Sequence, residues 1–142
     1  MLKNVIFVNQ AAAEINAGII NWAVISITDV ELKEYAKIKI GWYAVHRSKF
    51  LDADLKSHLY ENEALMQDHQ SLEIVDFVYS VAPHVEGILD HCRGGVSQSA
   101  AVAKWIAKTF GLPFNHQYSL FNTHVYDQLI KANALRDRRP KP

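Results

Sequence analysis

Most of the candidate chemistry in this sequence lies in one short segment around the chain's lone cysteine, Cys92. The segment reads Asp90-His91-Cys92-Arg93-Gly94-Gly95-Val96-Ser97-Gln98-Ser99. An apolar run at 85–89 precedes it, and a stretch rich in helix formers at 100–108 follows it. This order predicts a buried strand, a glycine-containing turn and a helix, with the thiol of Cys92 at the mouth of the turn.

A turn between a strand and a helix can hold an anion, because backbone N–H groups and the positive end of the helix dipole converge there. Gly94 and Gly95 make such a turn sterically easy. The dipole also favours a cysteine thiolate over its thiol, and we expect positive charge from His91 and Arg93 to add to this effect. The pattern predicts an activated cysteine nucleophile at an oxyanion site.

The spacing in this segment resembles the signature of cysteine-dependent tyrosine and dual-specificity phosphatases of the small bacterial or phage type. That signature is written His-Cys-x-x-Gly-x-x-Arg-Ser/Thr. The positions that match it are His91, Cys92, Gly95 and Ser99. Gln98 stands where the family has arginine, and the segments 25–29 and 121–126 are similar to weaker motifs of the same group.

The resemblance implies a fold and a set of roles. The fold is α/β, with a central, mainly parallel sheet flanked by helices. Cys92 would attack phosphorus and form a cysteinyl-phosphate, Ser99 would stabilise the departing thiolate, and His91 would support the thiolate. The phosphate-binding loop would comprise Arg93, Gly94, Gly95, Val96, Ser97 and Gln98. A hydroxyl in the first helical turn, such as that of Ser97, can also cap the helix.

The family also uses an aspartate on a preceding loop to protonate the leaving oxygen. The best match to that loop is 50–54, in which Asp52 is our first choice for the acid and Asp54 the second. The chemistry needs such a group because an alkoxide or phenolate leaves poorly without a proton. A positioned acid contributes on the order of 100- to 10,000-fold.

Gln98 leaves open whether the chain is an enzyme. The family's arginine contacts two phosphoryl oxygens as a bidentate cation, whereas glutamine offers a neutral amide donor. Since one oxyanion donor is worth about 3–4 kcal/mol, turnover should fall about 100- to 1,000-fold. We therefore keep a weakly active phosphatase as the first hypothesis and a pseudophosphatase that binds a phosphorylated partner or oxyanion as the second. A rhodanese-like sulfurtransferase ranks third, because Cys-Arg-x-Gly also begins such loops.

The rest of the chain supplies elements that would position this loop. We expect strands at 5–8, 22–27, within 38–45 and at 85–89, and helices at 11–15, 63–79, 100–108 and from Asn122, a good N-cap residue. The continuous apolarity of 22–27 predicts a strand buried on both faces. His69 lies on the apolar stripe of the 63–79 helix, so we expect a hydrogen-bonded core histidine.

Composition limits the partners of the protein. The 142 residues suit one phosphatase-like domain at 1–135 with a basic C-terminal tail at 136–142. Fifteen basic and fifteen acidic side chains give no net charge, so we expect neither nucleic acid nor a membrane as partner. The histidine spacing predicts no metal site, and we expect no cofactor. The expected partner is a phosphorylated protein or small phosphate ester in the cytoplasm, and the sequence carries no signal for oligomeric state.

Overall fold

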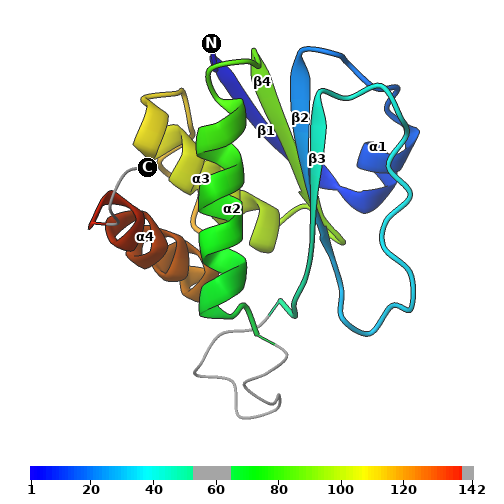
Figure 1. Cartoon of the computed structure of the whole chain (residues 1–142). Helices are drawn as coiled ribbons and strands as arrows, with labels where there is room; N and C mark the ends of the chain where they lie inside the picture. Colours follow the sequence, from blue (N-terminus) through cyan, green and yellow to red (C-terminus); the bar gives the residue numbers. More distant parts are fainter. Residues whose placement is uncertain (53–64, 139–142) are drawn as a thin grey trace.

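A four-stranded parallel sheet forms the centre of the protein in a computed structural model that describes residues 1–52 and 65–138 (Figure 1). The strands are β1 (Asn4–Asn9), β2 (Trp22–Thr28), β3 (Ala44–Lys49) and β4 (Gly87–Cys92), in the spatial order β1-β4-β2-β3. Every residue of β4 is buried, and β2 is buried from its second residue onward, whereas the edge strands β1 and β3 are partly exposed. The apolar runs of the central strands follow from this burial on both faces.

Helices cover both faces of the sheet, so the expected α/β architecture is confirmed. The helices are α1 (Gln10–Ile15), α2 (Asp68–Val81), α3 (Gln98–Phe110) and α4 (Thr123–Arg138). Helices α2, α3 and α4 share one face, and α1 lies on the other (Figure 1). Local sequence sets the helix ends: Asn9 caps α1 by accepting the N–H of Ala12 at 2.8 Å, and Gly111 ends α3 in a left-handed conformation at φ +68°.

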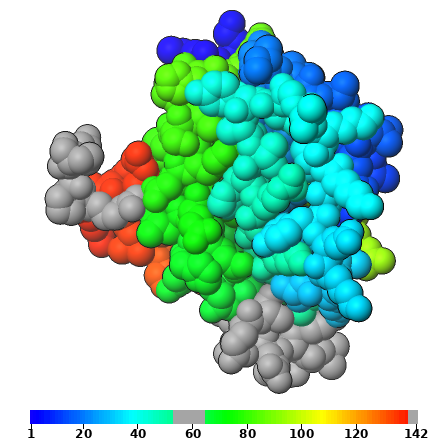
Figure 2. All heavy atoms as spheres, turned by 45° about the vertical axis from the view of Figure 1, so that its right-hand side comes forward, coloured from blue at the N-terminus to red at the C-terminus, as the bar shows by residue number. Residues whose placement is uncertain are grey.

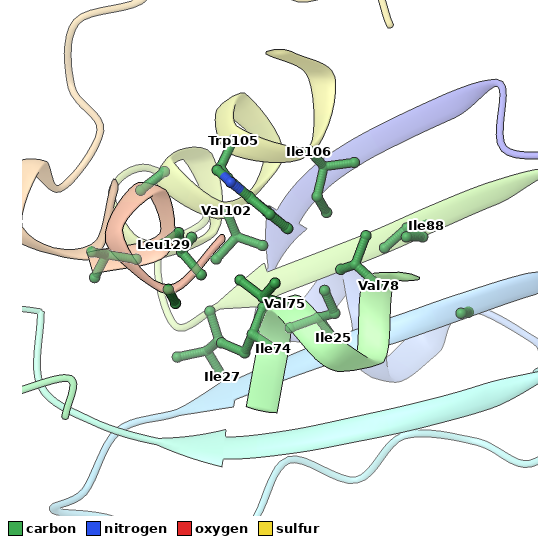
Figure 3. Packing of buried hydrophobic residues seen from close by; sticks show 14 of the residues in the cluster. Ile25, Ile27, Ile74, Val75, Val78, Ile88, Val102, Trp105, Ile106 and Leu129 are labelled. Carbon is green, nitrogen blue, oxygen red and sulfur yellow. The ribbon is translucent and has the colours of Figure 1, made fainter. Parts of the chain in front are cut away.

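The main core lies between the sheet and the three helices on its larger face. Ile25 of β2, Val75 of α2 and Trp105 of α3 pack together in this layer (Figure 3). Leu129 of α4 belongs to the same buried cluster. A smaller cluster around Trp42 packs under α1 on the opposite face. In Figure 2, β3 and the segment before it lie beside α2 on one side of the molecule. The larger core therefore supports the face of β4 from which Cys92 projects.

Two elements differ from their predicted positions. The third strand occupies Ala44–Lys49 and not 38–45, because Gly41, at φ +108°, interrupts the earlier apolar run. Its polar residues suit an edge strand: Arg47 Nη1 donates to the Ala36 carbonyl at 3.0 Å. Within the described residues the helix predicted from 63 begins at Asp68, where Gln67 and Gln70 form a reciprocal cap.

Two smaller expectations also change. His69 is exposed in the first turn of α2, so the prediction of a core histidine is wrong. Helix α4 continues to Arg138, three residues into the expected tail, and Arg136 Nε lies 3.5 Å from Asp76 Oδ1. The guanidinium of Arg136 also lies 3.9 Å from the ring centre of Tyr79. Of the helices in residues 1–52 and 65–138, none has the length and apolarity that crossing a membrane requires.

Candidate active site

The last residue of β4 is Cys92, and its side chain is buried, with 2% of its surface exposed. Because all the strands are parallel, their carboxyl ends meet at this edge of the sheet, which is where open α/β sheets bind ligands. Asn9 at the end of β1 and Asp29 just after β2 lie at the same edge. The topology therefore brings the predicted nucleophile to the usual ligand-binding edge of the fold.

The loop that follows Cys92 curls back over the sulfur. The backbone N–H of Gly95 donates to Cys92 Sγ at 3.3 Å. Gly95 has φ +67°, and a Cβ at this position would lie 2.4 Å from the backbone nitrogen of Asn9. Only glycine fits both the conformation and the space, whereas a Cβ on Gly94 would meet nothing within 4 Å. The glycine at 95 is thus what lets the loop close on the sulfur.

Ser99 provides the second polar contact to the sulfur. Its Oγ lies 3.1 Å from Cys92 Sγ, and its side chain is fully buried in the first turn of α3. A thiolate at Cys92 would accept hydrogen bonds from both the Ser99 hydroxyl and the Gly95 N–H. The positive end of the α3 dipole adds to this stabilisation of negative charge.

Asp52 lies beside the loop and is held there by two donors. Ser97 Oγ donates to Asp52 Oδ1 at 2.7 Å, and Asn122 Nδ2 donates to the same oxygen at 2.9 Å. Both bonds use Oδ1, so Oδ2 is the oxygen on which a proton can reside. Ser97 consequently does not cap α3 with its side chain. Asp54, the second choice for the acid, lies outside the described residues.

Asn122 is a residue of the site that was predicted from the sequence only as a helix cap, although it lies in the segment 121–126 that resembles a weaker motif of the phosphatases. Its Oδ1 accepts the N–H of Val125 at 3.0 Å and so caps α4 as predicted, while its Nδ2 holds Asp52. Its backbone N–H also donates to the carbonyl of Ser97 at 3.1 Å. Asn122 thus links Asp52 to the start of α4 through its side chain, and it contacts the loop through its backbone.

Gln98 turns its amide toward the chain that follows β3. Its Nε2 donates to the carbonyl of Phe50 at 2.9 Å, and the side chain is buried. Phe50 stands two residues before Asp52. The residue in the place of the family's arginine therefore ties the end of the loop to the backbone that carries Asp52.

Arg93 points away from the sulfur. Its side chain is 70% exposed, and its Nη1 lies 3.9 Å from Asp29 Oδ2. Three residues further along the loop, the carbonyl of Val96 accepts a hydrogen bond from the hydroxyl of Tyr118. Tyr118 stacks edge to face on Phe7 at 5.4 Å, so an aromatic pair supports the outer side of the loop.

His91 lies on the opposite face of β4 from Cys92. Its Nε2 is 2.6 Å from Ser26 Oγ, and its Nδ1 is 3.4 Å from the carbonyl of Cys92. Burial lowers the pKa of His91, which outweighs the raising effect of the hydrogen bond to the Cys92 carbonyl. The ring is neutral near pH 7, so the positive charge expected from His91 is absent. Its contacts instead fix the backbone at Cys92.

Comparison with solved structures finds the same architecture in two human proteins. A tyrosine phosphatase-like serine/threonine/tyrosine-interacting protein is 17% identical, over 80% of this chain and 77% of that one, with a TM-score of 0.51. The dual-specificity phosphatase DUSP28 is 14% identical, over 95% of each chain, with a TM-score of 0.55. Comparisons of the sequence with family models and with curated proteins give no match. The chain therefore has the fold of the tyrosine and dual-specificity phosphatases, as its loop sequence predicts.

Proposed function

We propose that this protein hydrolyses phosphate monoesters slowly, through a phosphate-binding loop at residues 92–98 with Cys92 as nucleophile. The observation that carries the proposal is the pair of polar contacts to Cys92 Sγ, from the Gly95 N–H at 3.3 Å and Ser99 Oγ at 3.1 Å. A structural cysteine in an apolar core has no need of such contacts. Together they suit a sulfur that carries negative charge at the mouth of an anion-binding turn.

In the first step the Cys92 thiolate attacks phosphorus, and the bond between phosphorus and the ester oxygen breaks. The leaving oxygen takes a proton from Asp52, which becomes a carboxylate. The N–H groups of the loop hold the non-bridging oxygens, as a helix N-terminus holds a phosphate. The products of this step are the free alcohol or phenol and a cysteinyl-phosphate.

In the second step water attacks the phosphorus of the cysteinyl-phosphate, and the bond to sulfur breaks. The Asp52 carboxylate accepts a proton from that water, so it acts now as a base. The sulfur leaves as a thiolate, and the Ser99 hydroxyl donates a hydrogen bond to it. Inorganic phosphate is released, and both residues return to their starting states.

The substrate is a phosphorylated protein or a small phosphate ester in the cytoplasm. The chain has no net charge, so its attraction for phosphate comes from the loop amides and the α3 dipole. A thiol that must stay reduced to act suits a reducing compartment.

A second candidate function is phosphate recognition without turnover. The observation that favours it is the bond from Gln98 Nε2 to the Phe50 carbonyl, which commits this side chain to the protein backbone. A neutral amide so placed supplies no cation to the transition state. The loop would then bind a phosphorylated partner and release it unchanged.

Phosphate release from an aryl phosphate distinguishes the two functions in wild type, Cys92→Ser and Gln98→Arg. Release by wild type that Cys92→Ser abolishes supports the enzyme, and Gln98→Arg should then be about 100-fold faster. Release by Gln98→Arg alone supports the binding module. The control is Gln128→Arg, the same change on α4, which should leave the rate unaltered. If no variant releases phosphate and none binds it, both functions are wrong.

A further inference from the structure

Asp90 is a buried acid that the proposed reaction does not use. It lies in the centre of β4 with none of its surface exposed. Neither of its carboxylate oxygens has a hydrogen-bond partner among the residues that the structure describes. A carboxylate in this position would lose its hydration with nothing in exchange, so burial favours the neutral acid.

Asp90 and Cys92 project from the same face of β4, because they are two residues apart on one strand. The alternation places Ile88 and Cys92 in the larger core and Leu89 in the smaller one. The sulfur of Cys92 receives two polar contacts, whereas the carboxyl of Asp90 receives none among the described residues. If one negative charge resides on this pair, the contacts assign it to Cys92.

The other groups around Asp90 are almost all uncharged. Its register neighbours are Phe7 of β1 and Ile25 of β2. The buried faces of α2 and α3 carry no titratable side chain within the described chain, and on α4 the buried one is His124, at 3.1 Å from the Met66 carbonyl. Burial, and then the charge of Cys92, raise the pKa of Asp90 well above its usual range.

We propose that Asp90 is a positioning residue that regulates the charge of the loop: as a neutral acid it permits an anion there, and as a carboxylate it repels one. This inference rests on the proposed anion-binding function of the loop. When Asp90 ionises, it places a second negative charge under the ligand, roughly 10 Å from the loop centre. At an effective dielectric of about 20, the repulsion between two like charges at that separation lowers the affinity of the loop for an anion about tenfold or more.

The test is the pH dependence of sulfate binding by the full chain, measured by calorimetry from mildly acidic to alkaline pH. Sulfate keeps its charge over this range, and a Cys92→Ser background removes the titration of the thiol. In that background we expect sulfate affinity to fall at least about tenfold as the pH rises. Asp90→Asn or Asp90→Val, each introduced separately into the Cys92→Ser background, should abolish this fall in sulfate affinity. Asp137→Asn, a control that removes an exposed carboxylate on α4, should leave the shape of the profile unchanged.

Two results would overturn the inference in different ways. If Cys92→Ser binds sulfate with the same pH profile with and without Asp90, Asp90 does not regulate the loop, although the anion site stands. If no variant that is folded by circular dichroism binds sulfate at any pH, the inference fails together with the proposed function. Two replacements at position 90 are used so that at least one folded protein lacks the carboxyl.

Discussion

The side-chain amide of Gln98 donates a hydrogen bond of 2.9 Å to the backbone carbonyl of Phe50, across 48 residues of sequence. The bond joins the first residue of α3 to the segment that leads from β3 to Asp52. Gln98 thus has a structural role in the position where the phosphatase signature has a cation. Its replacement should change stability as well as chemistry.

Gln98→Met should lower the free energy of unfolding by about 1–3 kcal/mol, because it leaves the Phe50 carbonyl buried without its donor. Methionine has a similar length, so the loss of packing is small. Urea denaturation measures the difference. Gln128→Met on α4 is the control and should change stability by less than about 0.5 kcal/mol. Equal stability of Gln98→Met and wild type would show that the bond contributes nothing.

Gly95→Ala should destabilise the protein strongly, whereas Gly94→Ala should not. At Gly95 the new Cβ would meet the backbone of Asn9 at 2.4 Å, and φ +67° costs a further 1–2 kcal/mol or so for a residue with a Cβ. At Gly94 the Cβ has open space. We expect losses of more than about 2 kcal/mol at 95 and less than about 1 kcal/mol at 94 in thermal or urea unfolding. Similar losses at both positions would contradict the described loop conformation.

Asp52→Asn should slow the hydrolysis of phenyl phosphate about 100- to 10,000-fold, because the leaving phenolate then departs without a proton. The effect should shrink for an aryl phosphate whose leaving group is more acidic. Ser97→Ala, which removes one of the two donors to Asp52 Oδ1, should have a smaller effect. An Asp52→Asn loss that is the same for good and poor leaving groups would exclude Asp52 as the acid.

Asp90 should make the fold less stable as the pH rises. Its pKa in the folded protein is raised, chiefly by burial, above the ordinary value of 3.8. Above that value the unfolded chain loses the proton and the folded chain keeps it, so the free energy of unfolding falls about 1.4 kcal/mol per pH unit until the folded carboxyl ionises. Asp90→Asn removes this slope, whereas Asp137→Asn, at an exposed position, should retain it.

Urea denaturation of wild type, Asp90→Asn and Asp137→Asn at several pH values measures how the free energy of unfolding of each protein changes with pH. Burial also lowers the pKa of His46 and His91, so their contribution to stability is lost as the pH falls below about 6.5. That effect is common to all three proteins, and the difference between wild type and Asp90→Asn isolates the aspartate. If the free energies of unfolding of wild type and Asp90→Asn change with pH in parallel, Asp90 is already ionised in the folded state and this prediction is wrong.

The sequence predicts best those elements that are determined by residues adjacent to one another in the chain. The strand, turn and helix around Cys92 follow from a buried apolar run, glycine at 95 and a stretch of helix formers. The continuous apolarity of β2 correctly indicated a strand inside the sheet. By contrast β3 was misplaced, because an edge strand needs fewer apolar residues and Arg47 and Lys49 obscure its pattern.

Contacts between distant segments could not be predicted in the same way. The bond from Asn122 to Asp52 spans 70 residues, and no local pattern links the two positions. The neutral state of His91 also depends on burial in the complete fold, whereas proximity in the sequence suggested a charge next to Cys92. The outward direction of Arg93, toward Asp29, is set by the turn and by the end of β2.

Trapping of the covalent intermediate tests the central claim most directly. Wild type is mixed with an aryl phosphate, quenched in acid and digested, and the phosphate is located by mass spectrometry, with Cys92→Ser as control. We predict phosphate on Cys92 of wild type and none in the control, with more trapped in Ser99→Ala because its thiolate leaves more slowly. Release of phosphate by wild type with no label on Cys92, or with label on another residue, would contradict the assignment of Cys92 as the nucleophile.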